Sequence, residues 1–193
     1  MLELANSQEI MEETDSNNRR VVLALYEALS SHDVAMVHQV LAPNLEWWFH
    51  GPPSHQFLMH LLTGIAPASA TSFRFVPQSI TSFGPTVLVE GCDHDRSISW
   101  VHACTVTDGI ITQVREYFNT SLTVMRLSNS NSSSMPSSSS RVEINPLRCP
   151  SLWESSVSSQ VGKSVPGLVL VIWYCFLPIF PQSAVAVTII KSK

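Results

Sequence analysis

The chain has 193 residues, of which 45% are apolar and only 13% are charged, about half the charged share of an ordinary soluble domain. This length suits one domain with residues to spare, and the apolar share is sufficient for a buried core. The formal charge is −4 and no run of Lys and Arg occurs, so the sequence lacks the basic surface that nucleic-acid binding requires.

The cysteines and the first residues indicate the cellular compartment. The four cysteines show no Cys-x-x-Cys spacing, and the first 18 residues carry five acidic and no basic side chains. An acidic start argues against a secretory leader and against an Arg-rich transit peptide. We therefore expect reduced thiols in a cytoplasmic protein, with the nucleus as a second location.

Helices dominate the first third of the chain. Residues 1–17 are acidic and polar, and we expect them to form a flexible arm. One helix is expected over about 19–31, with apolar side chains at i, i+3, i+4 and i+7, and Asp33 caps a second, shorter helix. A strand is expected over about 45–50. The Gly-Pro-Pro that follows separates it from a third helix, which Gly64 is placed to end.

Four consecutive strands follow, because β-branched and aromatic residues fill runs that turn residues separate. We expect these strands over about 71–80, 87–92, 98–106 and 110–118. Helices first and strands later, without regular alternation, predict an α+β layer fold in which a curved antiparallel sheet packs on three N-terminal helices.

The turn at Asp108-Gly109 decides which side chains the last two strands place together. A two-residue turn would place Arg115 beside His102. A three-residue loop with a left-handed glycine would instead place Glu116 beside Trp100. We prefer the three-residue loop because it gathers one half-apolar face, namely Trp100, His102, Val114, Glu116 and Phe118.

Glu116 and His102 are the candidate catalytic pair. A carboxylate on an apolar sheet face has its proton affinity raised by desolvation, and a neighbouring imidazole can relay the proton. Both residues also admit structural interpretations, Glu116 as a surface carboxylate paired with an arginine and His102 as a hydrogen-bonded core residue. The expected pocket for a planar or apolar ligand is lined by Glu46, Trp48, His50, Glu90, Trp100, Val114 and Phe118.

Seven histidines are present, but their spacing does not predict a metal site. His55 and His60 lie five residues apart, and a helix places such residues on different faces. The sequence contains no Gly-x-Ser-x-Gly, no P-loop and no Gly-x-Gly-x-x-Gly. We expect neither a metal nor a cofactor.

The last third of the chain differs in composition. Nine of the thirteen residues 128–140 are serine, and such a segment cannot bury enough surface to fold. We expect a domain over 18–127, a disordered Ser-rich linker over 128–148, a further segment over 149–172, and a hydrophobic tail over 173–193. A helix that spans a membrane needs about 20 apolar residues, and prolines interrupt this tail. We therefore expect a soluble tail, and a membrane anchor is the alternative.

Three stretches of the chain are distinctive: LEWWFHGPPSHQFLMHLLTG, VEGCDHDRSISWVHACTVTDGIITQVREYFNTSL and CPSLWESSVSSQVGKSVPGLVL. Together they closely resemble the plant wound-induced protein 1 family, and the resemblance covers roughly residues 18–172. It implies a SnoaL-like member of the nuclear transport factor 2-like (cystatin-like) superfamily, which is a cone of sheet wrapped on helices with a pocket at its mouth. Glu116 stands where many SnoaL-like enzymes carry an acidic or polar pocket residue. Relatives end soon after GLVL, so residues 173–193 are an atypical tail.

The resemblance implies a plant protein expressed in wounding, stress or senescence, and it leaves three hypotheses for its activity. The first is binding of a small apolar metabolite without catalysis. The second is a SnoaL-type isomerase, cyclase or hydrolase that uses Glu116 and His102. The third is a protein-interaction module that dimerises through the outer sheet face. A carboxylate buried beside His102 in a pocket would favour the enzyme, and an interior plugged by Trp and Phe would favour the interaction module.

Overall fold

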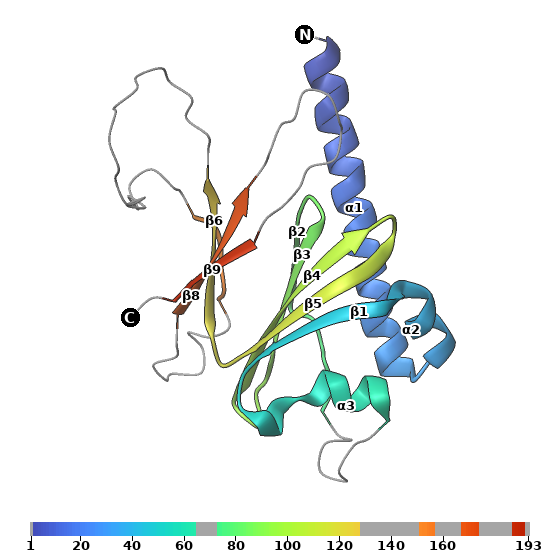
Figure 1. Cartoon of the computed structure of the whole chain (residues 1–193), viewed down its shortest axis with the longest axis vertical. Helices are drawn as coiled ribbons and strands as arrows, with labels where there is room; N and C mark the ends of the chain where they lie inside the picture. The colour runs from blue at the N-terminus through green and yellow to red at the C-terminus, as the bar shows by residue number, and fades with distance from the viewer. Residues whose placement is uncertain (1, 65–72, 128–150, 157–166, 174–186, 192–193) are drawn as a thin grey trace. The chain divides into compact units, whose positions relative to one another are not determined.

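The computed structural model of the chain describes residues 2–64, 73–127, 151–156, 167–173 and 187–191 (Figure 1). The chain divides into two compact units. Unit 1 comprises Met1–Thr120 and Ser155–Pro166, and unit 2 comprises Ser121–Glu154 and Gly167–Lys193. The Ser-rich segment over 128–148, expected to be a disordered linker, lies outside the described residues.

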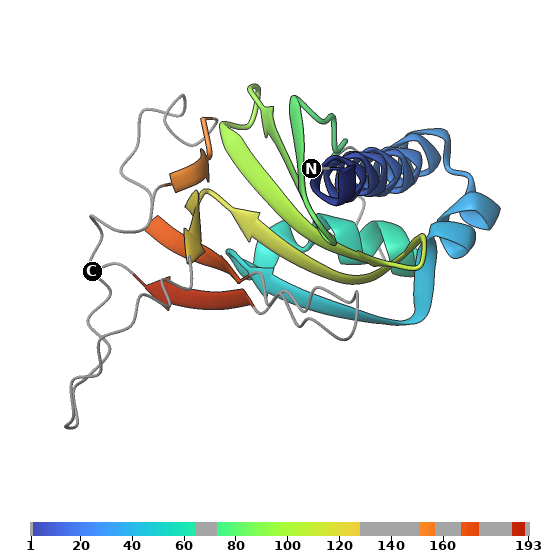
Figure 2. The same cartoon turned by 90° about the horizontal axis from the view of Figure 1, so that it is seen from above.

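The described part of unit 1 combines three α-helices with a five-stranded sheet. The helices are α1 (Leu2–Ser31), α2 (Val34–Val40) and α3 (Phe57–Thr63), with a short 3-10 turn at Pro53–His55. The strands are β1 (Leu41–His50), β2 (Ser79–Phe83), β3 (Thr86–Asp93), β4 (Ile98–Thr107) and β5 (Ile110–Phe118). Their order in the sheet is β1-β5-β4-β3-β2, and Figure 2 shows the sheet curving around α1 and α3. The expected α+β fold is confirmed. The sheet is mixed, however, because β1 runs parallel to β5.

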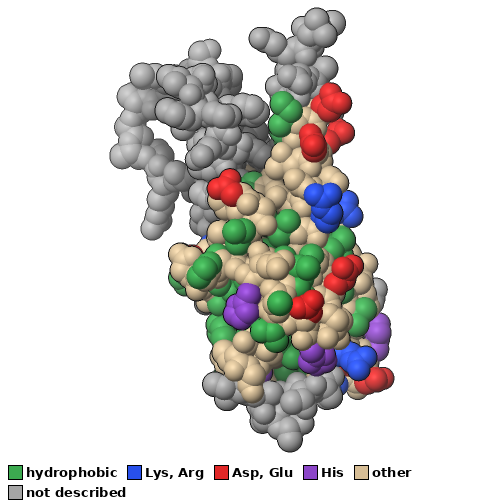
Figure 3. All heavy atoms as spheres, turned by 90° about the vertical axis from the view of Figure 1, so that its right-hand side faces the viewer, with side chains coloured by type: hydrophobic (Ala, Val, Ile, Leu, Met, Phe, Trp, Pro, Cys, Tyr) green, Lys and Arg blue, Asp and Glu red, His purple; other side chains and the backbone are tan. Residues whose placement is uncertain are grey.

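Helix α1 is longer than the sequence analysis predicted. Its residues from Leu2 onward, expected as a flexible arm, are helical. Strong helix formers make up more than half of residues 2–17, and no Gly or Pro interrupts them. Packing differs along the helix, since Ile10 is 56% exposed whereas Val22, Leu25 and Tyr26 are buried in the core. Figure 3 shows acidic side chains gathered around the exposed half.

The start of α2 and the end of α3 lie at the predicted residues. Asp33 caps α2, because its carboxylate accepts a hydrogen bond from the backbone N–H of Met36 at 3.0 Å. Gly64 ends α3 in the left-handed conformation, with φ of 67°.

Strand β2 starts at Ser79, later than the predicted strand over 71–80. Residues 73–78 precede it without forming a strand, and Pro77 in this segment has no N–H to donate to a sheet. The side chains of the segment still alternate, since Phe73 and Phe75 are buried in the core.

Gly91 on β3 lets this segment pass close to the sheet. A Cβ atom at position 91 would lie 2.5 Å from the carbonyl oxygen of Val76 and 2.4 Å from the ring of Trp100. Both distances are far below van der Waals contact, so only glycine fits here. The backbone at Val76 can therefore approach the sheet this closely.

The turn between β4 and β5 has two residues, so the three-residue loop that we predicted is wrong. Thr107 pairs with Ile110. Asp108 and Gly109 both have positive φ, 52° and 76°, as the two central residues of a type I′ turn require.

A β-bulge in β5 follows this turn and restores the predicted face. Ile111 pairs with Val106 and Gln113 pairs with Thr105, so Thr112 is the extra residue of the bulge and the register shifts by one residue there. Because the shift reverses the alternation, Glu116 pairs with His102, and Arg115 lies on the other face. Trp100, His102, Val114, Glu116 and Phe118 therefore share one buried face, as predicted.

Unit 2 contains a four-stranded sheet. Its strands are β6 (Ser121–Leu127), β7 (Ser151–Glu154), β8 (Gly167–Trp173) and β9 (Val187–Lys191), in the order β7-β6-β8-β9. Strand β8 runs parallel to β6 and antiparallel to β9. The chain leaves unit 1 at Ser121, earlier than the boundary expected near residue 127.

The hydrophobic tail over 173–193 contributes its end to this sheet as β9, and its residues 174–186 lie outside the described structure. Within the described residues, no helix is both long enough and apolar enough to cross a membrane.

Candidate functional site

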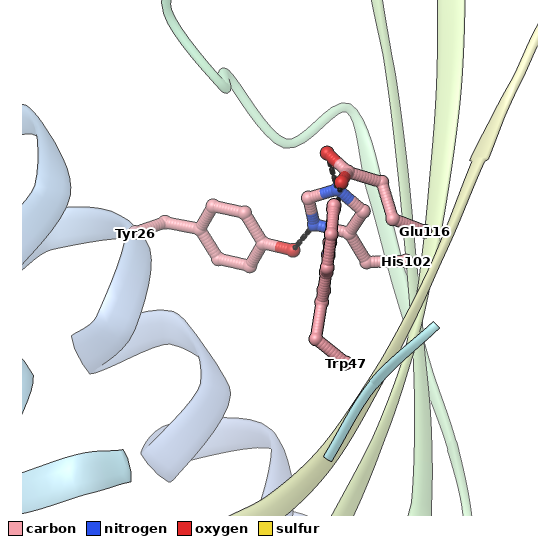
Figure 4. A network of polar contacts seen from close by, with 4 residues as sticks. All are labelled: Tyr26, Trp47, His102 and Glu116. Atoms are coloured by element: carbon pink, nitrogen blue, oxygen red, sulfur yellow. Dashed lines mark hydrogen bonds and ion pairs between the residues drawn. The ribbon is translucent and has the colours of Figure 1, made fainter. Parts of the chain in front are cut away.

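A chain of hydrogen bonds crosses the interior of unit 1 (Figure 4). The hydroxyl of Tyr26, on α1, lies 2.8 Å from Nδ1 of His102 on β4. Nε2 of His102 lies 3.2 Å from Oε1 of Glu116 on β5. The other carboxylate oxygen, Oε2, accepts a hydrogen bond from Nε1 of Trp47 on β1 at 3.1 Å. His102 and Glu116 are 1% and 0% exposed, so these groups bond to one another in the absence of bulk water.

One arrangement of protons satisfies all four side chains. The indole N–H of Trp47 can only donate, so Glu116 accepts at Oε2. If Nε2 of His102 carries the imidazole proton, it donates to Oε1, and Nδ1 is then free to accept from the hydroxyl of Tyr26. Every polar atom of the network then has a partner, which is the condition under which a buried polar network stabilises a fold.

Burial changes the acidity of the groups around Glu116. Burial raises the pKa of the Tyr26 hydroxyl well above its ordinary value, and the nearby Cys104 and Glu116 raise it further. Burial likewise raises the pKa of the Cys104 thiol to about 12, with a smaller contribution from Glu116. Tyr26 therefore keeps its proton at physiological pH and serves as a hydrogen-bond donor to His102.

Aromatic rings enclose the imidazole of His102. The ring centroids of Phe75 and Trp100 lie 4.8 and 4.9 Å from that of His102, and the ring of Tyr26 lies at 6.0 Å. Of the three cavities that we describe in unit 1, none is lined by His102 or Glu116. The buried pair thus lies beside a plug of aromatic side chains.

An apolar cavity of about 320 Å³ lies elsewhere in unit 1, at the end of α1. Ten apolar side chains from α1, α2, β1 and α3 line it, among them Leu29, Val37 and Leu62. The remaining two lining residues are His32 and His38, which are exposed. Two further cavities, of about 360 and 530 Å³, are both lined by Phe75.

The structure brings together only part of the predicted site. Trp100, His102, Val114, Glu116 and Phe118 lie on the inner face of the sheet. Glu46, Trp48, His50 and Glu90 lie on the opposite face and do not line a pocket with them. The prediction turned the wrong side chains of β1 inward, because the structure has Trp47 and Phe49 on the inner face.

The prediction also missed two residues of the hydrogen-bond chain, Tyr26 and Trp47. The apolar stripe of the first helix contained Tyr26, whereas nothing local distinguished the two adjacent tryptophans.

Glu90 has a different role from the one predicted. Its carboxylate is 2% exposed on the outer face of the sheet, where it accepts hydrogen bonds from the hydroxyls of Ser155 and Ser156, both at 2.8 Å. It therefore binds a segment that lies 65 residues further along the chain. On the same face the ring of His50 stacks on that of Tyr117, with centroids 4.9 Å apart.

The described residues contain no group of three or more His, Cys, Asp or Glu side chains arranged to hold a metal ion. Cys92 and His94 lie near each other, with Sγ and Nδ1 3.9 Å apart, but no third ligand of this kind joins them within the described part of the chain.

The sequence is similar to two plant proteins. "Wound-induced protein 1" of Solanum tuberosum is 60% identical over 112 residues, which cover 58% of this chain and 98% of the relative. "Senescence associated gene 20" of Arabidopsis thaliana is 55% identical over 115 residues, 59% of this chain and all of the relative. Among solved structures, an NTF2-like protein from Burkholderia xenovorans is 26% identical, with a TM-score of 0.41 over 54% of this chain and 90% of that protein.

A family model, wound-induced protein WI12, matches residues 59–172 of the chain. The match includes β2 to β7 and all of β8 except Trp173, and it ends before β9. It confirms the resemblance inferred from the sequence, over a shorter range than the 18–172 expected there. The chain belongs to the wound-induced protein WI12 family.

Proposed function

We propose that the protein binds a small apolar molecule in the cavity at the end of α1. The observation that carries this proposal is the lining of the cavity, ten apolar side chains around about 320 Å³. Pockets for small ligands usually have volumes of about 300–1,000 Å³ and mainly apolar walls with a few polar groups. His32 and His38 supply such polar groups, because each imidazole can donate or accept a hydrogen bond.

The relatives suggest when such a ligand would be present. The similar proteins from Solanum tuberosum and Arabidopsis thaliana are named for wounding and for senescence. We propose that the ligand is an apolar metabolite that accumulates in wounded or ageing plant tissue. Native mass spectrometry of the protein isolated from such tissue would detect it as a bound mass.

Filling the cavity tests the proposal directly. Ala42 lines the cavity, and a phenyl ring at this position would occupy part of it. We expect Ala42→Phe to weaken binding of the fluorescent apolar probe N-phenyl-1-naphthylamine by about tenfold or more, which corresponds to about 1.4 kcal/mol.

Ala35→Phe is the matched control, because Ala35 is exposed on α2 and does not line the cavity. It should bind the probe as the wild type does. Equal affinity of all three proteins, each shown to be folded by its unfolding transition, would contradict the proposal.

Acid–base catalysis at His102 is the second candidate, and the buried Tyr26–His102–Glu116 chain favours it. A carboxylate that orients an imidazole is an arrangement suited to proton transfer. We place it second because neither His102 nor Glu116 lines a described cavity. In addition, both ring nitrogens of His102 are hydrogen-bonded within the chain, so the hydrogen bond between Nδ1 and the Tyr26 hydroxyl must open before the imidazole can take a proton from a substrate. The raised pKa of Tyr26 also makes its hydroxyl a poor proton source. The reaction that it supports best is removal and return of a proton beside a carbonyl group, as in an isomerase.

Deuterium exchange tests this second candidate. The protein should catalyse exchange of solvent deuterium into 2-tetralone, a small apolar ketone with acidic C–H groups, as followed by NMR. His102→Asn should abolish this exchange, and His50→Asn on the outer face should not change it. Exchange that persists in His102→Asn, or that never exceeds the rate in buffer, would exclude His102 as the base.

A further inference from the structure

We propose that Phe75 determines access and specificity at His102, and that its ring occupies the place of a planar ring of the ligand. This proposal rests on the second candidate function, acid–base chemistry at His102. It names both the side chain that covers the imidazole and the class of molecule that would replace it.

The first argument is the position of Phe75 between two cavities and the network. Its side chain lines the cavities of about 360 and 530 Å³. Its ring centroid also lies 4.8 Å from that of His102, and the side chain is only 4% exposed. The ring of Phe75 therefore separates the open space from the imidazole.

Tyr26 is the other side chain that both lines one of these cavities and contacts His102. The side chains of Tyr26 and Phe75 differ in the interactions that hold them against His102. Tyr26 is held by a hydrogen bond of 2.8 Å to Nδ1, whereas Phe75 can make only ring and other apolar contacts. Displacing Phe75 breaks no hydrogen bond, so its side chain is the one that moves more easily.

The backbone that carries Phe75 is anchored on its C-terminal side. The carbonyl of Val76 lies against Gly91, and the N–H of Gln78 donates to the carbonyl of Glu90 at 2.8 Å. Movement that uncovers His102 is therefore expected as a rotation of the Phe75 side chain, with the segment remaining on the sheet. The space opened this way would join both cavities to the imidazole.

The surroundings of the Phe75 ring define the ligand class. Trp100 meets this ring edge-on at 5.1 Å and 88°, and Phe73 does so at 4.9 Å and 69°. Aromatic rings favour such edge-to-face contacts with another flat ring. The site thus fits an aromatic or otherwise planar unsaturated ring that lies tilted against His102, as the Phe75 ring does at 48°, with an apolar substituent extending into the adjoining cavities.

Toluene binding to a truncated variant tests both parts of the proposal. Phe75→Ala leaves a ring-sized apolar space, and engineered spaces of this kind bind small aromatic molecules. We expect toluene to bind Phe75→Ala at least about tenfold more tightly than the wild type. It should also shift the NMR signal of the His102 Hε1 proton in a saturable way.

Phe73→Ala is the matched control. Phe73 is a buried phenylalanine of the same segment and lines one of the same cavities, but its ring packs on Phe57, at 4.1 Å. Toluene should leave the His102 signal unchanged in this variant. Methylcyclohexane, which has similar size and is not planar, should bind Phe75→Ala more weakly than toluene does.

An unchanged His102 signal in Phe75→Ala, or an equal shift in Phe73→Ala, would overturn the assignment of Phe75. Equal binding of toluene and methylcyclohexane would overturn the planar class. If Phe75→Ala does not fold, Phe75→Leu with benzene as the probe gives the same comparison. The two failures are distinguishable: if toluene shifts the His102 signal in Phe75→Ala but the wild type does not exchange deuterium into 2-tetralone, the position of Phe75 is supported and the acid–base function fails.

Discussion

Glu116 is the residue on which the interior network depends, because both of its carboxylate oxygens accept hydrogen bonds away from water. Glu116→Gln keeps the shape but replaces one acceptor oxygen by an NH2 group. Either this group faces an N–H donor, or His102 takes the other tautomer and the hydroxyl proton of Tyr26 loses its acceptor. A buried donor without an acceptor costs about 1–3 kcal/mol. We expect the free energy of unfolding, measured in urea, to fall by about that amount.

Glu46→Gln is the matched control for this experiment. Glu46 also lies on the sheet and accepts a hydrogen bond from Gln113 at 2.7 Å, but in an exposed position. Its substitution should change the free energy of unfolding by less than about 0.5 kcal/mol. Equal stability of Glu116→Gln and the wild type would contradict the dependence of the network on this carboxylate.

The buried thiol of Cys104 should make the free energy of unfolding depend on pH in the alkaline range. Its pKa is raised from an ordinary value of 9.0 to about 12 by burial and by Glu116. Between these values the folded state keeps the thiol proton and the unfolded state releases it, so the unfolded state is favoured as pH rises. The stabilisation by this group is complete below pH 9 and declines by about 1.4 kcal/mol per pH unit above it.

Cys104→Ala removes this contribution. Urea unfolding of both proteins at several pH values between 8 and 11 should give a shallower decline for the variant. The difference in slope should be about 1.4 kcal/mol per pH unit. Tyr26 acts in the same direction in both proteins, because burial, the largest cause of its raised pKa, remains in the variant. Parallel curves for the two proteins would show that the thiol of Cys104 titrates normally.

Strand β5 shows how one element determines the chemistry of the interior. Its bulge at Thr112 changes which side chains the strand turns inward. Without the bulge, the two-residue turn would place Arg115 opposite His102 and leave Glu116 outside. Because side chains alternate faces along a strand, this single extra residue decides which group is buried beside His102. With it the carboxylate of Glu116 is buried there, and without it the guanidinium of Arg115 would be.

The segment at Ser155 and Ser156 belongs to unit 1, although the sequence analysis placed it outside the domain. Its two hydroxyls donate to the buried carboxylate of Glu90. Replacing both serines by alanine removes these donors from a group that is 2% exposed. We expect a loss of about 1–3 kcal/mol in the free energy of unfolding of unit 1. A chain that ends at Leu127 should lose at least as much.

Two variants control for the role of the hydroxyls. Ser156→Thr keeps a hydroxyl at an exposed position and should change stability by less than about 0.5 kcal/mol. Ser151→Ala alters an exposed serine of β7 and should have as little effect. If the double alanine variant and the chain ending at Leu127 both unfold like the wild type, unit 1 does not need this segment.

At the scale of the whole molecule, we expect removal of the tail to change amide exchange in unit 2 and to leave unit 1 unchanged. Deleting residues 174–193 removes β9, which pairs with β8 from Leu168 to Ile172. The amides of β8 that bond to β9 should then exchange with deuterium much faster, whereas those of β4 in unit 1 should not change. Uniformly faster exchange in both units would show that they unfold together, and unchanged exchange in β8 would show that β9 does not pair in solution.

The local sequence was sufficient to predict much of this protein. It predicted both short helices and the strands β3, β4 and β5, since caps such as Asp33 and turns such as Asp108-Gly109 act through residues a few positions away. The quoted stretches were also sufficient to identify the family. In addition, the alternation of side chains along β4 suffices to place Trp100 and His102 on one face, because it depends only on their spacing of two residues.

Tertiary structure decided which side chains meet. The adjacent residues Trp47 and Trp48 have the same chemistry, and only the pairing of β1 with β5 determines that Trp47 reaches Glu116. The same holds for Tyr26, whose partner lies 76 residues away, and for Glu90, which the sequence analysis assigned to the pocket. A shift of one residue reverses every side chain of a strand, and the energy that selects the register comes from burial against distant elements. No local pattern in the sequence contains that energy.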